Sequence, residues 1–161
     1  DRTELSVPTR LNVTMSPRLT LQLFAQPLLS AGNYLKYKQL AAARTFSFVA
    51  FTEGDYAAAG GGTCAGGRTC QDATGRRLVD FDGNGTSDLS FTDRDFNIRS
   101  LIGNAVLRWE YRPGSTLYLV WQRQQEDAGT EPFSLGRDAR GLLAAEARNV
   151  FLLKVSYWLG L

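Results

Sequence analysis

The sequence predicts an all-β fold, the C-terminal portion of an antiparallel up-and-down transmembrane β-barrel with roughly five long strands and long extracellular loops. Three observations predict it. Apolar and polar residues alternate along two long hairpins, tight turns alternate with long loops, and the last segment is strongly apolar on one side. Short turns on one side of the membrane and long loops on the other are typical of outer-membrane barrels, whose strands need roughly 9–11 residues to cross.

The first hairpin covers residues 3–29 and turns at Pro17, with alternation over residues 4–26. Every second residue of each arm is apolar, which gives both arms one apolar face. Counted outward from Pro17, each arm reaches a proline after roughly ten residues, Pro8 on one arm and Pro27 on the other. Because proline cannot donate to a sheet ladder, we expect both prolines near the outer rim of the strands.

The second hairpin covers residues 102–124, and its Pro113-Gly114 pair suits the central positions of a type II turn. Its arms alternate in the same way as those of the first hairpin. Three aromatic residues share the apolar parity near the strand ends opposite the long loops. Such a band is typical of a lipid-facing girdle at the inner membrane interface, and its members are Trp109, Tyr111 and Tyr157.

The final segment, residues 149–161, has an apolar residue at every odd position from Phe151 to Leu161. We interpret this stripe as facing lipid. Trp158 falls on the opposite side and needs a neighbouring side chain to cover it. Arg123 has the parity of the apolar face but lies near the outer rim, at the level of anionic lipid headgroups.

The face opposite the apolar stripe is polar and is expected to line the barrel lumen. Two of its members, Arg108 and Glu110, are two residues apart on one strand and can form an ion pair. A soluble β-sandwich, with this polar face in water and the apolar face in a core, remains the alternative. The lumen-facing polar residues are predicted to be Arg10, Asn104, Arg108, Glu110 and Lys154.

We expect one partial barrel domain over residues 1–161. It has two long extracellular loops, residues 31–97 and residues 125–148. Segments 44–51 and 78–81 read as short strands that extend a hairpin. Segment 136–147 reads as a short helix.

Cys64 and Cys70 are the only cysteines, and the chain has no histidine with which they could complete a zinc site. We expect a short disulfide formed in an oxidising compartment, with free thiols as the alternative.

The segment from Asp80 to Asp88 has the spacing of a calcium loop, with acidic or amide side chains at its first, third, fifth and ninth positions and Gly85 at the sixth. The bidentate glutamate of an EF-hand is missing, since Phe91 stands there. The spacing resembles the loops between strands of integrin-type propellers. The alternative is an acidic turn without an ion. The calcium ligands are predicted to be Asp80, Asp82, Asn84, Thr86 and Asp88.

Composition narrows the function classes. A net charge of +2 selects no partner by bulk charge, and no nucleic-acid partner is expected. Without histidine, a Ser-His-Asp or Cys-His arrangement cannot be built from these residues. Asp93 and Asp95 offer acid/base carboxylates, but solvated loop side chains are the simpler reading. The sequence therefore favours a role without catalysis in this chain.

Residues 88–127 resemble the C-terminal barrel domain called domain of unknown function 5916, and residues 4–34 and 149–161 fit the same family. The resemblance implies a bacterial outer-membrane protein with lipid as a partner, often with a family-nine carbohydrate-binding module ahead of the barrel. It also implies binding, uptake or processing of polysaccharide or oligosaccharide. The chain then begins inside a longer barrel, whose missing strands lie upstream of Asp1.

Two other functions remain open from the sequence. One is a soluble, calcium-binding, all-β carbohydrate-binding or adhesion module. The other is a membrane-associated hydrolase whose catalytic residues lie elsewhere.

Overall fold

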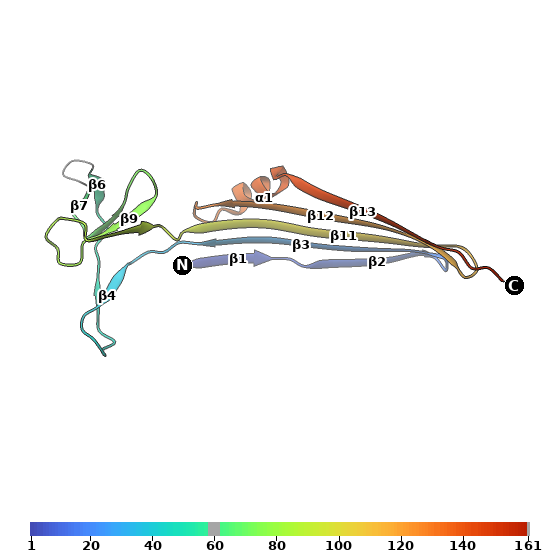
Figure 1. Cartoon of the computed structure of the whole chain (residues 1–161), viewed down its shortest axis with the longest axis horizontal. Helices are drawn as coiled ribbons and strands as arrows, with labels where there is room; N and C mark the ends of the chain where they lie inside the picture. Colours follow the sequence, from blue (N-terminus) through green and yellow to red (C-terminus); the bar gives the residue numbers. More distant parts are fainter. Residues whose placement is uncertain (58–61, 161) are drawn as a thin grey trace. The chain divides into compact units, whose positions relative to one another are not determined.

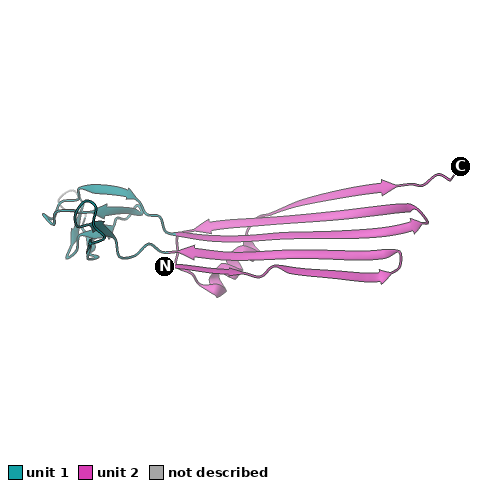
Figure 2. Ribbon diagram, turned by 90° about the horizontal axis from the view of Figure 1, so that it is seen from below, with its two compact units in different colours: residues 1, 33–95 teal, residues 2–32, 96–161 magenta. Residues whose placement is uncertain are grey.

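The structure, a computed structural model, describes residues 1–57 and 62–160. It contains two compact units (Figure 2), which we call the insert unit, Asp1 and residues 33–95, and the sheet unit, residues 2–32 and the described chain from Phe96 onward. Both are built from antiparallel sheets, so the predicted all-β antiparallel class is confirmed. In the described part of the chain, no helix has the length and apolar character needed to cross a membrane.

One long sheet forms the sheet unit (Figure 1), in the order β1-β3-β11-β12-β13 with β2 also pairing with β3. Its strands are β1 (Arg2–Ser6), β2 (Thr9–Ser16), β3 (Leu19–Gly32), β11 (Phe96–Arg112), β12 (Ser115–Gly129) and β13 (Ala147–Ser156).

β1 and β2 form one long strand that is interrupted at Pro8. Both pair with β3 in the same register, since Ser6 lies opposite Leu28 and Thr9 opposite Ala25. Val7 donates its N–H to the carbonyl of Pro27 at 3.2 Å. Pro27 has no N–H to donate in return, so its missing ladder bond falls beside the interruption at Pro8. β1 and β3 continue to pair beyond the two prolines, so the prolines do not mark the ends of these strands, and their place at a barrel rim stays a prediction.

The register brings the predicted apolar stripes onto one face of the sheet. Residues directly opposite each other point to the same side. Apart from the irregular pairs Ser16–Leu19 and Arg112–Ser115 beside the two hairpin turns, odd residues pair with odd residues and even with even throughout the sheet. We call the two sides the odd face and the even face. Two complete rows of the odd face are Leu11, Leu23, Ala105, Trp121 and Phe151, and Val13, Leu21, Leu107, Leu119 and Leu153.

The second hairpin has the predicted turn, since Gly114 has a φ of 74°, as the third position of a type II turn requires. β12 runs on to Gly129, so the loop before β13 covers residues 130–146 and is shorter than the predicted 125–148. It contains the expected helix, α1 (Leu135–Ala144).

β13 ends at Ser156, whereas the sequence suggested a strand up to the last residue. Beyond it the backbone N–H of Trp158 donates to Ser115 Oγ at 3.0 Å, which draws this segment toward the β11–β12 turn. The indole of Trp158 remains exposed. The predicted position of Leu161 lies outside the described residues.

α1 packs on the odd face at the end of the sheet away from the hairpin turns. α1 contacts β3, β11 and β12; its Leu142 is buried, as are Leu29 and Ala31 at this end of β3. Beside these apolar residues lies a polar cluster. The carboxylate of Asp138 is completely buried and accepts hydrogen bonds from Ser134 N at 2.8 Å and from Asn97 Nδ2 at 3.2 Å.

Arg99 lies in the same cluster and is nearly buried. Its guanidinium pairs with Asp127 at 2.9 Å and with Glu131 at 3.3 Å, and its Nε lies 3.9 Å from Asp138. Burial raises the pKa of Asp138, but the hydrogen bonds from Ser134, Arg137 and Asn97 outweigh it, so the pKa is lowered overall. The carboxylate therefore stays charged and holds α1 on the sheet.

Three small sheets make up most of the insert unit, in the orders β10-β9-β8, β4-β5 and β6-β7. The predicted strands in segments 44–51 and 78–81 exist, but they pair inside this unit and do not extend a hairpin, so that part of the expectation was wrong. The strands are β4 (Lys38–Leu40), β5 (Phe48–Ala50), β6 (Asp55–Ala57), β7 (Thr63–Ala65), β8 (Thr69–Gln71), β9 (Arg76–Val79) and β10 (Leu89–Thr92).

The attachment of α1 makes a first prediction. Replacing Asp138 by Ala removes the buried acceptor of Asn97 and of the Ser134 N–H, and a charge 3.9 Å from Arg99. We expect α1 to lose about 2–3 kcal/mol of local stability. Asp127→Asn is the control, because Asp127 is part-exposed and its ion pair contributes less than about 1 kcal/mol. Amide hydrogen exchange of residues 135–144 in the full-length protein measures both. Equal protection in wild type and Asp138→Ala would contradict this attachment.

Candidate functional site

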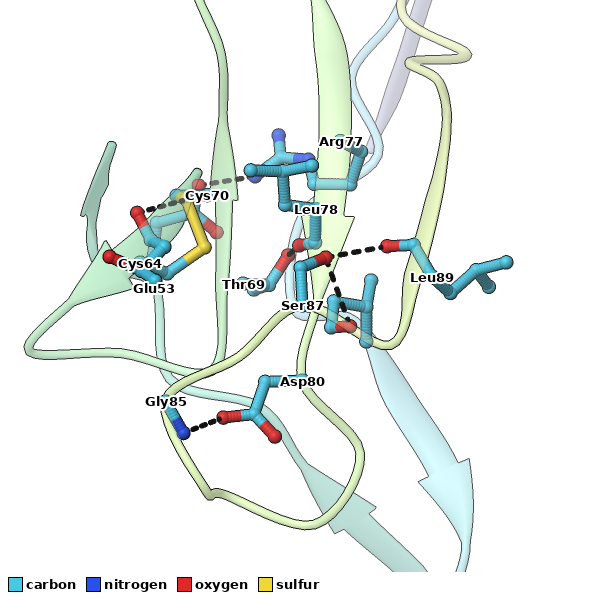
Figure 3. Close-up of a disulfide and its surroundings, with 12 residues drawn as sticks. Glu53, Cys64, Thr69, Cys70, Arg77, Leu78, Asp80, Gly85, Ser87 and Leu89 are labelled. Carbon is cyan, nitrogen blue, oxygen red and sulfur yellow. Dashed lines mark hydrogen bonds and ion pairs between the residues drawn. A yellow bond between two sulfur atoms is a disulfide. The ribbon is translucent and has the colours of Figure 1, made fainter. Parts of the chain in front are cut away.

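The acidic loop connects β9 to β10 and begins at Asp80, directly after the buried end of β9. Its carboxylate accepts the backbone N–H of Gly83 at 2.6 Å and of Gly85 at 2.8 Å (Figure 3 shows the second contact). Both glycines have φ near +80°, at 80° and 86°, a conformation that side chains rarely adopt. The loop therefore folds around the Asp80 carboxylate.

The other predicted ligands gather in the same loop. Asp82 accepts the N–H of Asn84 at 3.0 Å, Asn84 accepts the N–H of Thr86 at 2.7 Å, and Asp88 accepts the N–H of Phe81 at 2.7 Å. One carboxylate oxygen each of Asp80, Asp82 and Asp88 lies within 4.8 Å of the others. A carboxylate oxygen that accepts one hydrogen bond keeps a second lone pair, so this all-oxygen set fits a hard cation such as calcium.

Hydrogen bonds keep the carboxylate of Asp80 charged. Burial raises the pKa of Asp80, but hydrogen bonds from Gly85 and Gly83, with a further one involving Asp82, lower it overall. The group is thus a carboxylate at neutral and mildly acidic pH.

The predicted disulfide is confirmed between Cys64 on β7 and Cys70 on β8, with Cα atoms 5.4 Å apart. It ties the β6-β7 sheet to the β10-β9-β8 sheet, as Figure 3 shows. Thr69 is buried beside it and donates its hydroxyl to the carbonyl of Leu78 at 2.9 Å. The disulfide therefore braces the sheet from which the acidic loop leaves.

Asp93 lies in a buried network rather than in solvent. It accepts from Arg77 Nη2 at 2.8 Å and from the hydroxyl of Tyr37 at 3.1 Å, and Arg77 also pairs with Glu53. Burial raises the pKa of Asp93, but Arg77 and Tyr37 more than offset this and lower it. Burial, with the bond to Asp93, raises the pKa of Tyr37 to about 12. Asp95 accepts the N–H of Tyr34 at 2.6 Å. Both carboxylates thus have structural partners.

The three residues predicted to form a girdle, Trp109, Tyr111 and Tyr157, gather near the hairpin-turn end of the sheet. The rings of Trp109 and Tyr111 meet edge to face with centroids 6.2 Å apart, and the hydroxyl of Tyr111 donates to the carbonyl of Ser156 at 3.2 Å. Tyr157 follows directly and accepts from Arg112 at 2.9 Å. Trp109 and Tyr157 are about half exposed, so aromatic surface is available at this level.

The even face carries all five predicted lumen residues, spread over β2, β11 and β13. Arg108 and Glu110 form the expected ion pair at 3.7 Å. Arg10 lies over the ring of Phe24 at 5.9 Å, and Asn104 Oδ1 is a buried oxygen without a hydrogen-bond partner. Lys154 lies directly opposite Tyr118.

The odd face changes from apolar to polar along its length, which was not predicted from the sequence. From the row of Arg123 toward the turns it is almost wholly apolar. In the other direction it carries Asn97, Arg99, Gln125 and Asp127, the residues around α1. These polar residues at odd positions are the signal that could have shown that another element covers that end.

Comparisons with known proteins give no similarity to report: no family model, no curated protein and no solved structure matches this chain.

The disulfide makes a second prediction. Replacing Cys64 and Cys70 by Ser frees a loop of a few residues in the unfolded chain, and loop-closure entropy predicts a loss of about 2 kcal/mol. Limited trypsin digestion at Arg68, Arg76 and Arg77 measures this, since these sites lie on or next to β8 and β9. Reduction of the wild type provides the matched control. Unchanged digestion in both would contradict the bracing role.

Proposed function

We propose that the sheet unit is part of a transmembrane β-barrel in a bacterial outer membrane, with its odd face toward lipid and its even face toward the lumen. One observation carries this proposal. Between the Arg123 row and the hairpin turns, the odd face is apolar over five neighbouring lines of chain, β2, β3, β11, β12 and β13.

The exposure of this face argues against an aqueous environment. Side chains such as Phe151, Leu153 and Val155 are 69%, 63% and 57% exposed. Soluble proteins rarely expose contiguous apolar patches of this kind. In the sandwich alternative a second layer covers this face, but among the described residues α1 is the helix on it and covers only its charged end.

The dimensions agree with a bilayer. The apolar part of β11 runs over residues 103–111, close to the roughly 9–11 residues that a tilted strand needs to cross. The aromatic girdle stands at one limit and Arg123 at the other. This is the arrangement expected of interfacial anchors.

The sheet has two edges, so a barrel needs further strands. β13 pairs only with β12 in the described chain, and β1 and β2 pair only with β3. Unpaired N–H and C=O groups are costly in hydrocarbon. We therefore propose that further strands of the same protein close the barrel, in agreement with the resemblance to domain of unknown function 5916. Glycan handling and a hydrolase activity stay predictions.

A second proposal concerns the acidic loop, which we propose binds calcium through Asp80, Asp82, Asn84, Asp88 and the carbonyl of Thr86. The support is the close approach of three carboxylates in a loop that is already folded around one of them.

Orientation of the sheet makes a third prediction. Leu119 lies mid-way along the apolar part of the odd face and Val120 is its neighbour on the even face. Leu119→Lys places a charge in lipid and should cost about 2–4 kcal/mol, whereas Val120→Lys points into the lumen and should cost far less. Folding of the full-length variants into lipid vesicles, followed by heat-modifiable gel migration, measures both.

Two outcomes would contradict the barrel. One is a larger loss for Val120→Lys than for Leu119→Lys. The other is a wild-type protein that is folded and fully soluble without detergent or lipid.

Calcium makes a fourth prediction. The full-length protein should bind calcium in isothermal titration, and Asp80→Asn should weaken binding at least ten-fold because it removes a charged ligand. Asp72→Asn is the matched control, since Asp72 also accepts turn N–H groups in the insert unit but lies outside the loop. Equal calcium affinity of wild type and Asp80→Asn would contradict this site.

A further inference from the structure

We propose that a hollow on the odd face, beside Arg123, holds one acyl chain of an anionic membrane lipid whose phosphate group is bound by Arg123. This inference rests on the proposed membrane orientation. It adds a specific lipid site to a surface that otherwise contacts lipid only generally.

Gly103, in the middle of β11, lacks the usual reasons for a glycine. Its φ is outside the left-handed region, the pairing of β11 with both neighbours is regular there, and a Cβ built on it would meet nothing closer than 3.7 Å. A glycine inside a strand weakens it and often marks a place where another molecule approaches the backbone.

The hollow extends around Gly103. Two of its neighbours on the odd face are also small, since Ala25 lies opposite it on β3 and Ala105 follows on β11, while Arg123 lies opposite it on β12. The cavity has a volume of about 360 Å³, at the small end of ligand pockets. Its exposed lining is wholly apolar, and its walls include Leu11, Leu23, Leu101 and Trp121.

Trp121 is a fixed wall. Its indole N–H donates to Asn149 at 3.0 Å, and its ring stacks on Phe151 with an angle of 12° between the planes. Such a wall suits an apolar chain, which needs contact area and no hydrogen bonds.

Arg123 supplies the charge at the edge of the hollow. Its Nε donates to Gln125 Oε1 at 3.0 Å, which directs the guanidinium toward the next row, away from the hairpin turns. In the described chain no carboxylate forms an ion pair with Arg123. The remaining N–H groups are free to bind a phosphate in the bidentate manner typical of arginine. A single molecule with an anionic head and an apolar chain satisfies both parts.

The position of the hollow along the strands agrees with a membrane lipid as its ligand. Arg123 belongs to the row at which the odd face changes from apolar to polar, and Gln125, one row beyond, is buried under α1, where it donates to the carbonyl of Ala145 at 2.9 Å. Headgroups lie at this boundary and acyl chains extend from it toward the membrane centre.

The test uses the full-length protein in phosphatidylcholine nanodiscs with a small fraction of phosphatidylglycerol as the probe. Native mass spectrometry of the released protein counts retained phosphatidylglycerol. Arg123→Gln should lower its retention about five-fold, and Gly103→Leu should lower it comparably by filling the hollow. Arg148→Gln is the matched control, because Arg148 is an exposed arginine in the neighbouring row on the even face, and should have no effect.

Two results overturn the lipid site while leaving the barrel intact. One is an equal loss in Arg123→Gln and Arg148→Gln, which shows unspecific charge attraction. The other is unchanged retention in both Arg123→Gln and Gly103→Leu, each shown to be folded by heat-modifiable migration. If instead the wild type does not enter a bilayer, the proposed function fails, and the lipid site with it.

Discussion

The sheet unit depends on one constraint, the continuous antiparallel register from β2 to β13. Side chains of a strand alternate between two faces, so a slip of one residue in any pairing would reverse the faces of every strand beyond it. Leu21, Leu107, Leu119 and Leu153 lie in one row only because three successive pairings keep odd residues opposite odd residues. Even the interruption at Pro8 preserves this, since β1 and β2 pair with β3 in one register.

The same register divides the odd face into two regions with different partners. Toward the turns it presents aliphatic and aromatic side chains, for which hydrocarbon is the favourable surrounding. Toward the other end the odd face carries the polar residues Asn97, Arg99 and Gln125. Burying these side chains without hydrogen-bond partners would destabilise the fold. Asp138 of α1 and the carbonyl of Ala145 directly after it accept hydrogen bonds from Asn97 and Gln125. Arg99 pairs with Asp127 of β12 and with Glu131 in the loop before the helix. The polar end therefore needs the helix, and the apolar end needs a different cover.

Local alternation was enough to predict both hairpins, their turns and their apolar face. An apolar residue at every second position indicates a strand with one apolar face, and this pattern can be recognised without knowing which other strands pair with it. The continuation of β3 to Gly32 was not predictable in this way, since residues 29–32 are buried on both faces of the sheet and lose the alternation that one-sided exposure imposes. The partner of Arg77 could not be found from sequence either, because Asp93 and Glu53 come from distant parts of the chain. The acidic spacing did predict which carboxylates meet, since one loop holds all three.

The central claim is that the odd face of the sheet unit contacts lipid. The most direct test is a scan of nitroxide spin labels at residues 117–121 of the full-length protein in bilayers, where the disulfide-bonded Cys64 and Cys70 do not react. If the odd face contacts lipid, accessibility to oxygen is high at Leu117, Leu119 and Trp121, and accessibility to a polar nickel complex is high at Tyr118 and Val120. Accessibility to the nickel complex at the odd positions, or no alternation along β12, would contradict it.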